Sequence, residues 1–222
     1  MKNKAFTLAE TLITLGIIGV VAALTIPGLI NNYKAQKLHA KFLKTYSLLQ
    51  QGFKQMEADD VSLDPATYKN EPFYLTYINY YKGAINCGRD SIIAIAKRKS
   101  CYVPNSYVYR DYSRKSKIKE ILLDDGQFVL PDGTIIFFEM YNGLLVTADI
   151  NGLDKPNRWG VDLFTFQFIE GELRTMGSEG TLYTDLTEYC NYNISSSMNG
   201  IACAHLAKNN SDYFKHVIKE YK

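Results

Sequence analysis

The pattern of hydrophobic and polar positions predicts one long helix at the start of the chain. Residues 6–30 are almost entirely apolar, and a helix of about 20 apolar residues is long enough to span a membrane. Further along, apolar side chains recur at steps of three and four residues, which is typical of a helix that buries one face. Asp59 and Asp60 end that pattern. We therefore expect a helix to about Asp59, whose part 31–59 packs on a soluble domain.

Beyond residue 126 the pattern changes to short β-rich runs that are broken by turns. Asp-Gly, Asn-Gly and Glu-Gly pairs separate these runs, as they do in β-hairpins. The expected strands are 127–130, 134–140, 144–150, 161–169 and 173–175. A helix that covers one face of an antiparallel sheet is an α+β arrangement, and this is the fold class that we predict.

Two further segments flank the predicted sheet, 127–176. Residues 60–126 show no sustained period, and they separate the predicted helix from the sheet. The last segment, 177–222, contains a run rich in Ser and Asn and ends in a helical pattern over 211–221.

Composition allows a membrane helix plus one domain, and it excludes nucleic-acid binding driven by bulk charge. The 222 residues carry a formal net charge of +2, far from the strongly basic balance of a nucleic-acid-binding domain. Lysines do cluster over 34–44 on the predicted helix. Such a run is usually the solvated face of a helix, which is our interpretation; attraction of anionic lipid or DNA is the alternative.

One carboxylate, that of Glu10, lies near the start of the apolar segment. An ionisable group inside a membrane span costs roughly 2.5 kcal/mol or more, and it therefore indicates a function. The span is preceded only by residues 1–5, which include Lys2 and Lys4. These lysines predict that the N-terminus stays in the cytoplasm and that the rest of the chain lies outside it.

The first residues resemble the N-terminus of type IV pilins and pseudopilins: a short basic leader, a small residue, then Phe-Thr-Leu-x-Glu and a long apolar helix. The resemblance implies that a prepilin peptidase cuts between Ala5 and Phe6 and that Phe6 becomes N-methylated. It assigns Glu10 to the family's glutamate, which pairs with the amine of an adjacent subunit. Ala5 stands where the family usually has Gly. The motif is specific, but it covers only about the first quarter of the chain.

Pro27 stands where many pilins carry a helix-breaking proline. Proline removes a backbone donor, and Gly28 follows it directly. We therefore expect the helix to kink or to melt at these two residues.

The resemblance also implies a function and a set of partners. It predicts a pilin-like subunit of a type IV pilus or of a type II secretion pseudopilus, with 1–5 as leader, 6–30 as the transmembrane and assembly half, and 31–222 as the extracytoplasmic domain. Within that domain, 60–126 would be the variable insertion that pilins carry between the helix and the sheet. The expected partners are other pilin or pseudopilin subunits in a helical filament, the prepilin peptidase, the assembly platform of the bacterial inner membrane, and membrane lipid before assembly. A minor pilin that acts in adhesion or DNA uptake is the alternative. The sequence does not distinguish a pilus from a pseudopilus.

Two other interpretations of the N-terminus remain open. A conventional signal peptide would be cut after a small-residue site such as Val21-Ala22-Ala23. A plain single-pass anchor would remain uncut. Neither gives a reason for Glu10, and this disfavours both.

The four cysteines of an exported domain indicate disulfides. Four cysteines allow three pairings. Pilins commonly close a C-terminal loop with a disulfide, and the pair Cys190 and Cys203 resembles that feature. We choose the sequential pairing, Cys87–Cys101 and Cys190–Cys203. The spacing of Cys87 and Cys101 does not fit a zinc site, which needs close pairs of cysteines.

The loop over 149–162 is rich in oxygen donors. It resembles the Asp-x-Asn-Gly loop of many pilin-like proteins, and pseudopilins hold a calcium ion in a loop of comparable position. Calcium takes six to eight oxygen ligands, and Asp149, Asn151 and Asp154 are the candidates. The alternative is that these side chains cap turns through their own backbone. We expect no cofactor, and this calcium ion is the one candidate against that expectation.

The sequence contains no motif of a catalytic site. A phosphate-binding loop, a nucleophile elbow and an HExxH sequence are all missing, and the three histidines have no evident nucleophilic partner. We therefore expect a structural protein and not an enzyme. A membrane-anchored ectodomain of unknown activity is the remaining alternative.

Overall fold

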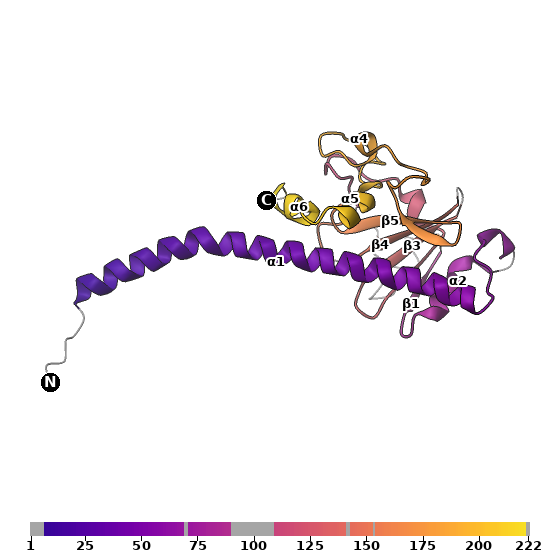
Figure 1. Ribbon diagram of the computed structural model, residues 1–222, viewed down its shortest axis with the longest axis horizontal. Helices are drawn as coiled ribbons and strands as arrows, with labels where there is room; N and C mark the ends of the chain where they lie inside the picture. Colours follow the sequence, from indigo (N-terminus) through magenta and orange to yellow (C-terminus); the bar gives the residue numbers. More distant parts are fainter. Residues whose placement is uncertain (1–6, 69–70, 90–108, 141–142, 153, 221–222) are drawn as a thin grey trace.

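The computed structural model describes residues 7–68, 71–89, 109–140, 143–152 and 154–220. Its first element is the helix α1, Leu8–Ala58, of 51 residues, which is about 75 Å long at 1.5 Å per residue. Thr7 is the N-cap of this helix and Asp59 is its C-cap, so the helix ends where the aspartates predicted. We call the described residues after Asp59 the head. Figure 1 shows that the first part of α1 projects away from the head and that the second part lies against it.

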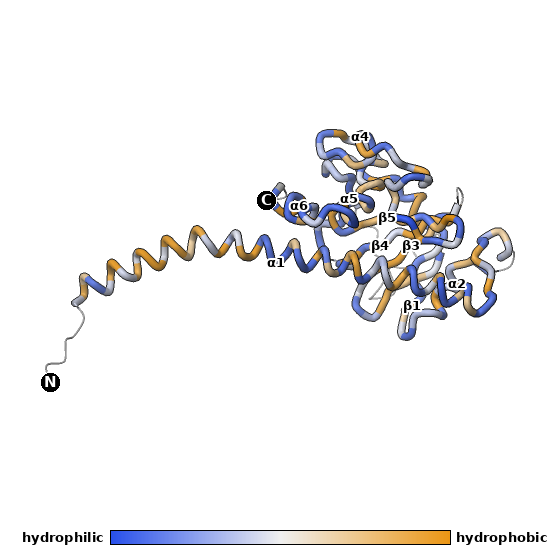
Figure 2. The backbone as a smooth tube through the Cα atoms, in the orientation of Figure 1, coloured by the Kyte–Doolittle hydropathy of each residue, from blue (hydrophilic) through white to orange (hydrophobic). Residues whose placement is uncertain are grey.

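The two parts of α1 differ in what surrounds them. Figure 2 shows the projecting part as an almost continuous hydrophobic stretch. Its large apolar side chains are exposed, namely Leu8, Leu12, Ile13, Leu15, Ile17, Ile18, Val20, Val21, Leu24, Ile26, Leu29 and Ile30. The second part buries one stripe, made of Ala35, Phe42, Thr45, Leu49, Gly52, Phe53 and Met56. The helix is therefore long and apolar enough to cross a membrane, and it is amphipathic where it contacts the head.

Helix α1 runs through Pro27 without a break. Pro27 has no N–H to donate to the carbonyl of Ala23, and the axis of α1 bends within its apolar part (Figure 1). The helix nevertheless continues through Gly28, so it does not melt at this point.

The head contains a six-stranded antiparallel sheet in which each strand pairs with its neighbours in the sequence. The strands are β1 (Ile85–Gly88), β2 (Gly126–Val129), β3 (Ile135–Glu139), β4 (Leu144–Asp149), β5 (Leu163–Ile169) and β6 (Glu172–Thr175). The last five agree with the predicted strands to within two residues, and the predicted α+β fold is confirmed. Strand β1 lies in the segment 60–126, where four residues are too few to show an alternating pattern.

Both faces of the sheet are covered, which explains why its central strands are apolar on both sides. All residues of β2, β3 and β4 are buried. On β3, Ile136 and Phe138 belong to the core on the α1 side, whereas Phe137 belongs to a second core with Trp159 and Ile201. The sheet is therefore a middle layer, with α1 on the side of one core and the second core on its other side.

Phe42 joins α1 to two other elements of the head. Its side chain is 0% exposed. The centroid of its ring lies 4.8 Å from that of Phe164 and 6.0 Å from that of Phe214. Phe164 belongs to β5, and Phe214 belongs to the C-terminal helix α6, Tyr213–Glu220. This one side chain therefore contacts the sheet and the C-terminal helix together.

Short helices lie in the described part of the segment between α1 and β2. They are η1 (Pro65–Thr67), α2 (Phe73–Tyr77), η2 (Ile78–Tyr80) and η3 (Glu120–Leu123). The hydroxyl of Tyr77 donates to the backbone carbonyl of Leu49 at 2.7 Å. The hydroxyl of Tyr81 in turn donates to the hydroxyl oxygen of Tyr77 at 2.6 Å. Gly52 makes this approach possible, because a Cβ at that position would lie 2.2 Å from the Tyr81 hydroxyl oxygen.

Raising the pH above 10 is expected to weaken this contact. Burial raises the pKa of Tyr77 well above its usual value of 10.0, and burial raises the pKa of Tyr81 as well. The unfolded chain therefore loses these protons first, so the stability that they confer is complete below pH 10 and is lost as the pH rises above it. The free energy of unfolding, measured in urea at stepped pH, should fall by up to about 1.4 kcal/mol per pH unit for each tyrosine.

Two variants test this pH dependence. Tyr77→Phe combined with Tyr81→Phe removes the two ionisable groups of this contact and should reduce the slope. Tyr192→Phe, at a position 38% exposed, should leave the slope unchanged. Equal slopes in the wild type and the double variant would contradict the prediction.

The C-terminal segment adds three short helices to the head. They are α4 (Leu186–Tyr189), α5 (Cys203–Asn209) and α6. Helix α6 contacts α1, and α5 contacts α1 and β5. The helix predicted over 211–221 is therefore present as α6, and it lies on α1.

Candidate functional site

The N-terminus of α1 places Glu10 in a capping box with Thr7. The Glu10 carboxylate accepts hydrogen bonds from the Thr7 backbone N–H and from the Thr7 hydroxyl, each at 2.8 Å. The Glu10 N–H donates to the Thr7 side-chain oxygen at 3.3 Å. These bonds satisfy donors that the first turn of a helix leaves without an intrahelical partner. Sequence reasoning missed Thr7, although the spacing Thr-x-x-Glu is the signature of a capping box.

Glu10 lies at the edge of an exposed apolar surface that extends along the projecting part of α1. Gly16, Gly19 and Gly28 belong to this part, and beyond the adjacent residues and backbone of the helix itself a Cβ at each would meet no described atom within 4 Å. The isolated chain therefore does not require glycine at these positions. Small residues let helices of neighbouring chains approach closely, so this surface is suited to contact with apolar helices or with lipid.

Three of the predicted site residues lie outside the described part of the chain. Ala5 and Phe6 lie outside the described residues, so the cleavage and the methylation stay predictions. Cys101 lies outside them as well, so the pairing Cys87–Cys101 also stays a prediction.

The end of β4 and the loop that follows it bring two carboxylates into the interior. Asp149 and Asp162 are both 0% exposed. The Tyr109 hydroxyl donates to Asp149 at 2.6 Å. The backbone N–H groups of Asn157 and Arg158 donate to Asp162 at 2.8 and 2.6 Å.

The two carboxylates affect each other's ionisation. Burial raises the pKa of Asp162 to about 6. Burial, together with the charge of Asp162, raises the pKa of Asp149 well above its usual value. A proton or a cation held by the pair would offset the cost of burying two negative charges.

The three predicted calcium ligands are not gathered at one point. Asp149 is buried, whereas Asp154 is exposed. In the ranges that the structure covers, no group of three or more His, Cys, Asp or Glu side chains is placed to hold a metal ion. Asn151 takes part in the turn itself: its N–H donates to Asp149, and its side-chain amide donates to the Lys155 carbonyl, both at 3.2 Å. These bonds agree with the turn-capping alternative.

A disulfide joins Cys190 and Cys203, as predicted. Its sequence separation is 13 residues, and closing a loop of this length stabilises the folded state by about 3 kcal/mol through the entropy lost by the unfolded chain. Within the loop, the Asn199 side chain is 0% exposed. It accepts from the N–H of Asn191 at 3.0 Å and donates to the Asn191 carbonyl at 2.8 Å. The loop is therefore held by its own polar groups as well as by the disulfide.

Comparisons of the chain with protein-family models, with curated proteins and with solved structures find no match. What the chain does must therefore be inferred from its own residues. The capping box, the exposed apolar surface of α1 and the buried carboxylate pair are the features available for that inference.

Proposed function

We propose that this chain is a structural subunit of a filament, of the kind formed by type IV pilins or by the pseudopilins of type II secretion. The observation that carries the proposal is the distribution of exposed apolar, charged and buried residues along α1. One continuous helix has a long exposed apolar part with a single carboxylate at its start, followed by an amphipathic part that packs on the head. A soluble monomer rarely exposes so large an apolar surface. The pilin-like motif at residues 5–10 supports the idea that neighbouring subunits finally bury this apolar surface.

In this proposal the apolar part of α1 has two successive environments. Lipid of the bacterial inner membrane covers it first, with the head outside the cytoplasm, and there the prepilin peptidase and the assembly platform act on it. In the filament, the same parts of neighbouring subunits replace the lipid, packing closely at small residues.

Glu10 needs a cation in the filament, because an unpaired charge away from water is costly. In the processed chain that cation is the amine of Phe6 on an adjacent subunit. The pairing fixes how far one subunit is displaced along the filament relative to the next.

Mass spectrometry of the amino terminus of the chain, purified from membranes, tests the proposal. The expected result is removal of residues 1–5 and one added methyl group on Phe6. A chain that begins at Leu24 would identify a conventional signal peptide, and an intact Met1 would identify a plain anchor; either result contradicts the proposal. Ala5→Leu is the control, because a bulky residue before the cut should leave the leader in place.

A calcium-bound form of the loop over 149–162 is a second candidate function. Asp149 and Asp162 are buried together, and the side-chain oxygens of Asn151 and Asn157 are buried without a hydrogen-bond partner in the described part of the structure. Calcium takes carboxylate and amide oxygens as ligands. The residues that would hold the ion are therefore these four, and the exposed Asp154 is not among them.

Calcium titration of the chelator-treated chain, followed by Trp159 fluorescence, tests this candidate. Trp159 is 0% exposed and adjoins Arg158, whose N–H donates to Asp162. We expect a change in emission and a rise in the thermal midpoint, both lost in Asp162→Asn and both retained in Asp154→Asn. Magnesium should have little effect, because it requires a smaller octahedral site. If calcium changes neither the emission nor the thermal midpoint, these side chains only cap turns and do not bind the ion.

A further inference from the structure

The lysines of α1 differ in whether they have acidic partners. Lys44 lies against the head and pairs with Asp132 at 2.6 Å. Lys34, Lys37 and Lys41 lie nearer the apolar part of the helix, and none of them forms an ion pair with another described residue. The charge of these three lysines is therefore not used within the described chain.

The three lysines line a groove of about 650 Å³ between α1, the loop after β4, and α6. Lys155 contributes a fourth ammonium group from the loop. Asp154 is the acidic residue among the groove's described lining. Four positive charges against one negative charge make the groove a site for an anion.

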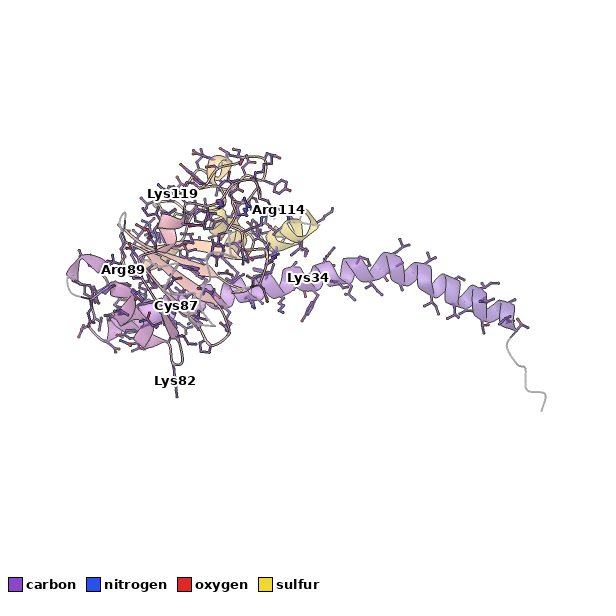
Figure 3. The ribbon with its side chains drawn as sticks, turned by 180° about the vertical axis from the view of Figure 1, so that it is seen from behind. Lys34, Lys82, Cys87, Arg89, Arg114 and Lys119 are labelled. Carbon is purple, nitrogen blue, oxygen red and sulfur yellow. A yellow bond between two sulfur atoms is a disulfide. The ribbon has the colours of Figure 1, made fainter. Side chains whose placement is uncertain are left out.

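The groove lies where α1 leaves the head toward its apolar part. Figure 3 shows Lys34 at this junction and Lys119 on a distant part of the head. Lys34 follows Ile30, the end of the apolar segment, by four residues, or about 6 Å along the helix. The headgroup layer on each side of a bilayer is about 5 to 8 Å thick, so Lys34 would lie within it.

The direction of the helix brings the other lysines toward the same layer. The Cα–Cβ bonds of a helix tilt toward its N-terminus, and the N-terminus of α1 is its apolar end. The Cα–Cβ bonds of Lys37 and Lys41 are therefore tilted toward the bilayer surface. Tyr33, which is 65% exposed and adjoins Lys34, is a residue type enriched at membrane interfaces.

We propose that this groove binds the phosphate of an anionic phospholipid headgroup while α1 is inserted in a bilayer. The proposal rests on the proposed membrane insertion of α1. It depends neither on filament assembly nor on the direction of insertion, because the groove adjoins the span in either orientation. The sequence pattern favoured a solvated face here. The groove, and the missing acidic partners within the described chain, favour the lipid.

Electron spin resonance of the full chain in phosphatidylcholine nanodiscs tests the proposal, with a trace of spin-labelled lipid as the probe. The measured quantity is the fraction of labelled phosphatidylglycerol held by the protein, relative to labelled phosphatidylcholine. We expect a preference of about fivefold, which corresponds to one lysine near an anionic surface. The preference should decline as salt screens the charges, and it should fall to near one in the combined variant Lys34→Gln, Lys37→Gln and Lys41→Gln.

Two controls have defined outcomes. The combined variant Lys115→Gln, Lys117→Gln and Lys119→Gln makes the same change of net charge at exposed positions of the head and should keep the wild-type preference. Asp154→Asn removes the acid from the groove and should increase it. The proposal is overturned if both triple variants lose the lipid preference equally. It is also overturned if the preference survives in the combined variant of Lys34, Lys37 and Lys41.

The remaining outcomes separate this proposal from the filament function. The three groove lysines could instead affect only the self-association of the chain in phosphatidylcholine discs, with no effect on lipid preference. That result would assign the groove to a second copy of the chain and overturn the proposal. Failure of the chain to enter the discs would overturn membrane insertion, and the lipid site with it. Entry without a lipid preference would overturn the lipid site alone.

Discussion

Glu10→Gln is expected to abolish incorporation into filaments while leaving helix α1 intact. Glutamine serves in a capping box as well as glutamate does, but it has no charge to pair with a neighbour's amine. Removing one partner of a buried ion pair costs about 3 to 5 kcal/mol, which lowers incorporation by about a hundredfold or more. The measurement is the yield of sheared filaments relative to the amount of chain in membranes. Glu10→Ala, which also loses the cap, should fail equally.

Thr7→Ala is the matched control, because it removes the cap and keeps the charge. Losing the capping hydroxyl costs about 1 kcal/mol of helix stability, and the filament yield should change little. Normal yield from Glu10→Gln together with a loss in Thr7→Ala would show that Glu10 acts only as part of the helix cap. That result would contradict the charge-pairing account.

The largest effect on stability is expected from Phe42→Ala. Truncating a buried Phe to Ala typically costs about 3 to 5 kcal/mol, a large part of the roughly 5 to 15 kcal/mol that stabilises a domain. Phe42 lies between Phe164 and Phe214, so the cavity would open where α1, the sheet and α6 meet. Urea unfolding of the full chain in detergent, followed by Trp159 fluorescence, measures the loss.

Leu43→Ala is the control for this variant. Leu43 is the next residue on the same helix and is 42% exposed, so its truncation should cost no more than about 0.5 kcal/mol. Similar losses in the two variants would show that the buried stripe does not hold α1 to the head.

The long helix and most of the sheet were predictable because their patterns repeat many times. The buried stripe of α1 extends over several helical turns, and the strands from β2 onward are separated by recognisable turns. Strand β1 has four residues, and its register with β2 shifts between Asn86 and Gly88. So short and irregular a strand has no period that a sequence can display.

The candidate sites were predictable only in part. Glu10 was conspicuous because charges are rare in apolar segments, whereas its cap was overlooked. At the polar loop, composition identified the oxygen donors but not which of them point inward. Asp149 is buried against Tyr109, a residue distant in the chain, while Asp154 is exposed. No local pattern contains that distinction, because tertiary contacts produce it.

If the head is exported as proposed, the agreement between strand order and chain order bears on how it folds. If the N-terminus stays in the membrane, the strands emerge in the order in which they pair. From β2 onward, each new strand meets a partner that has already emerged, and short loops close at low entropic cost. The C-terminal helices α5 and α6 must return across the chain to α1. Translocation of the last residues would therefore complete the core around Phe42, which makes the C-terminus the final part to fold.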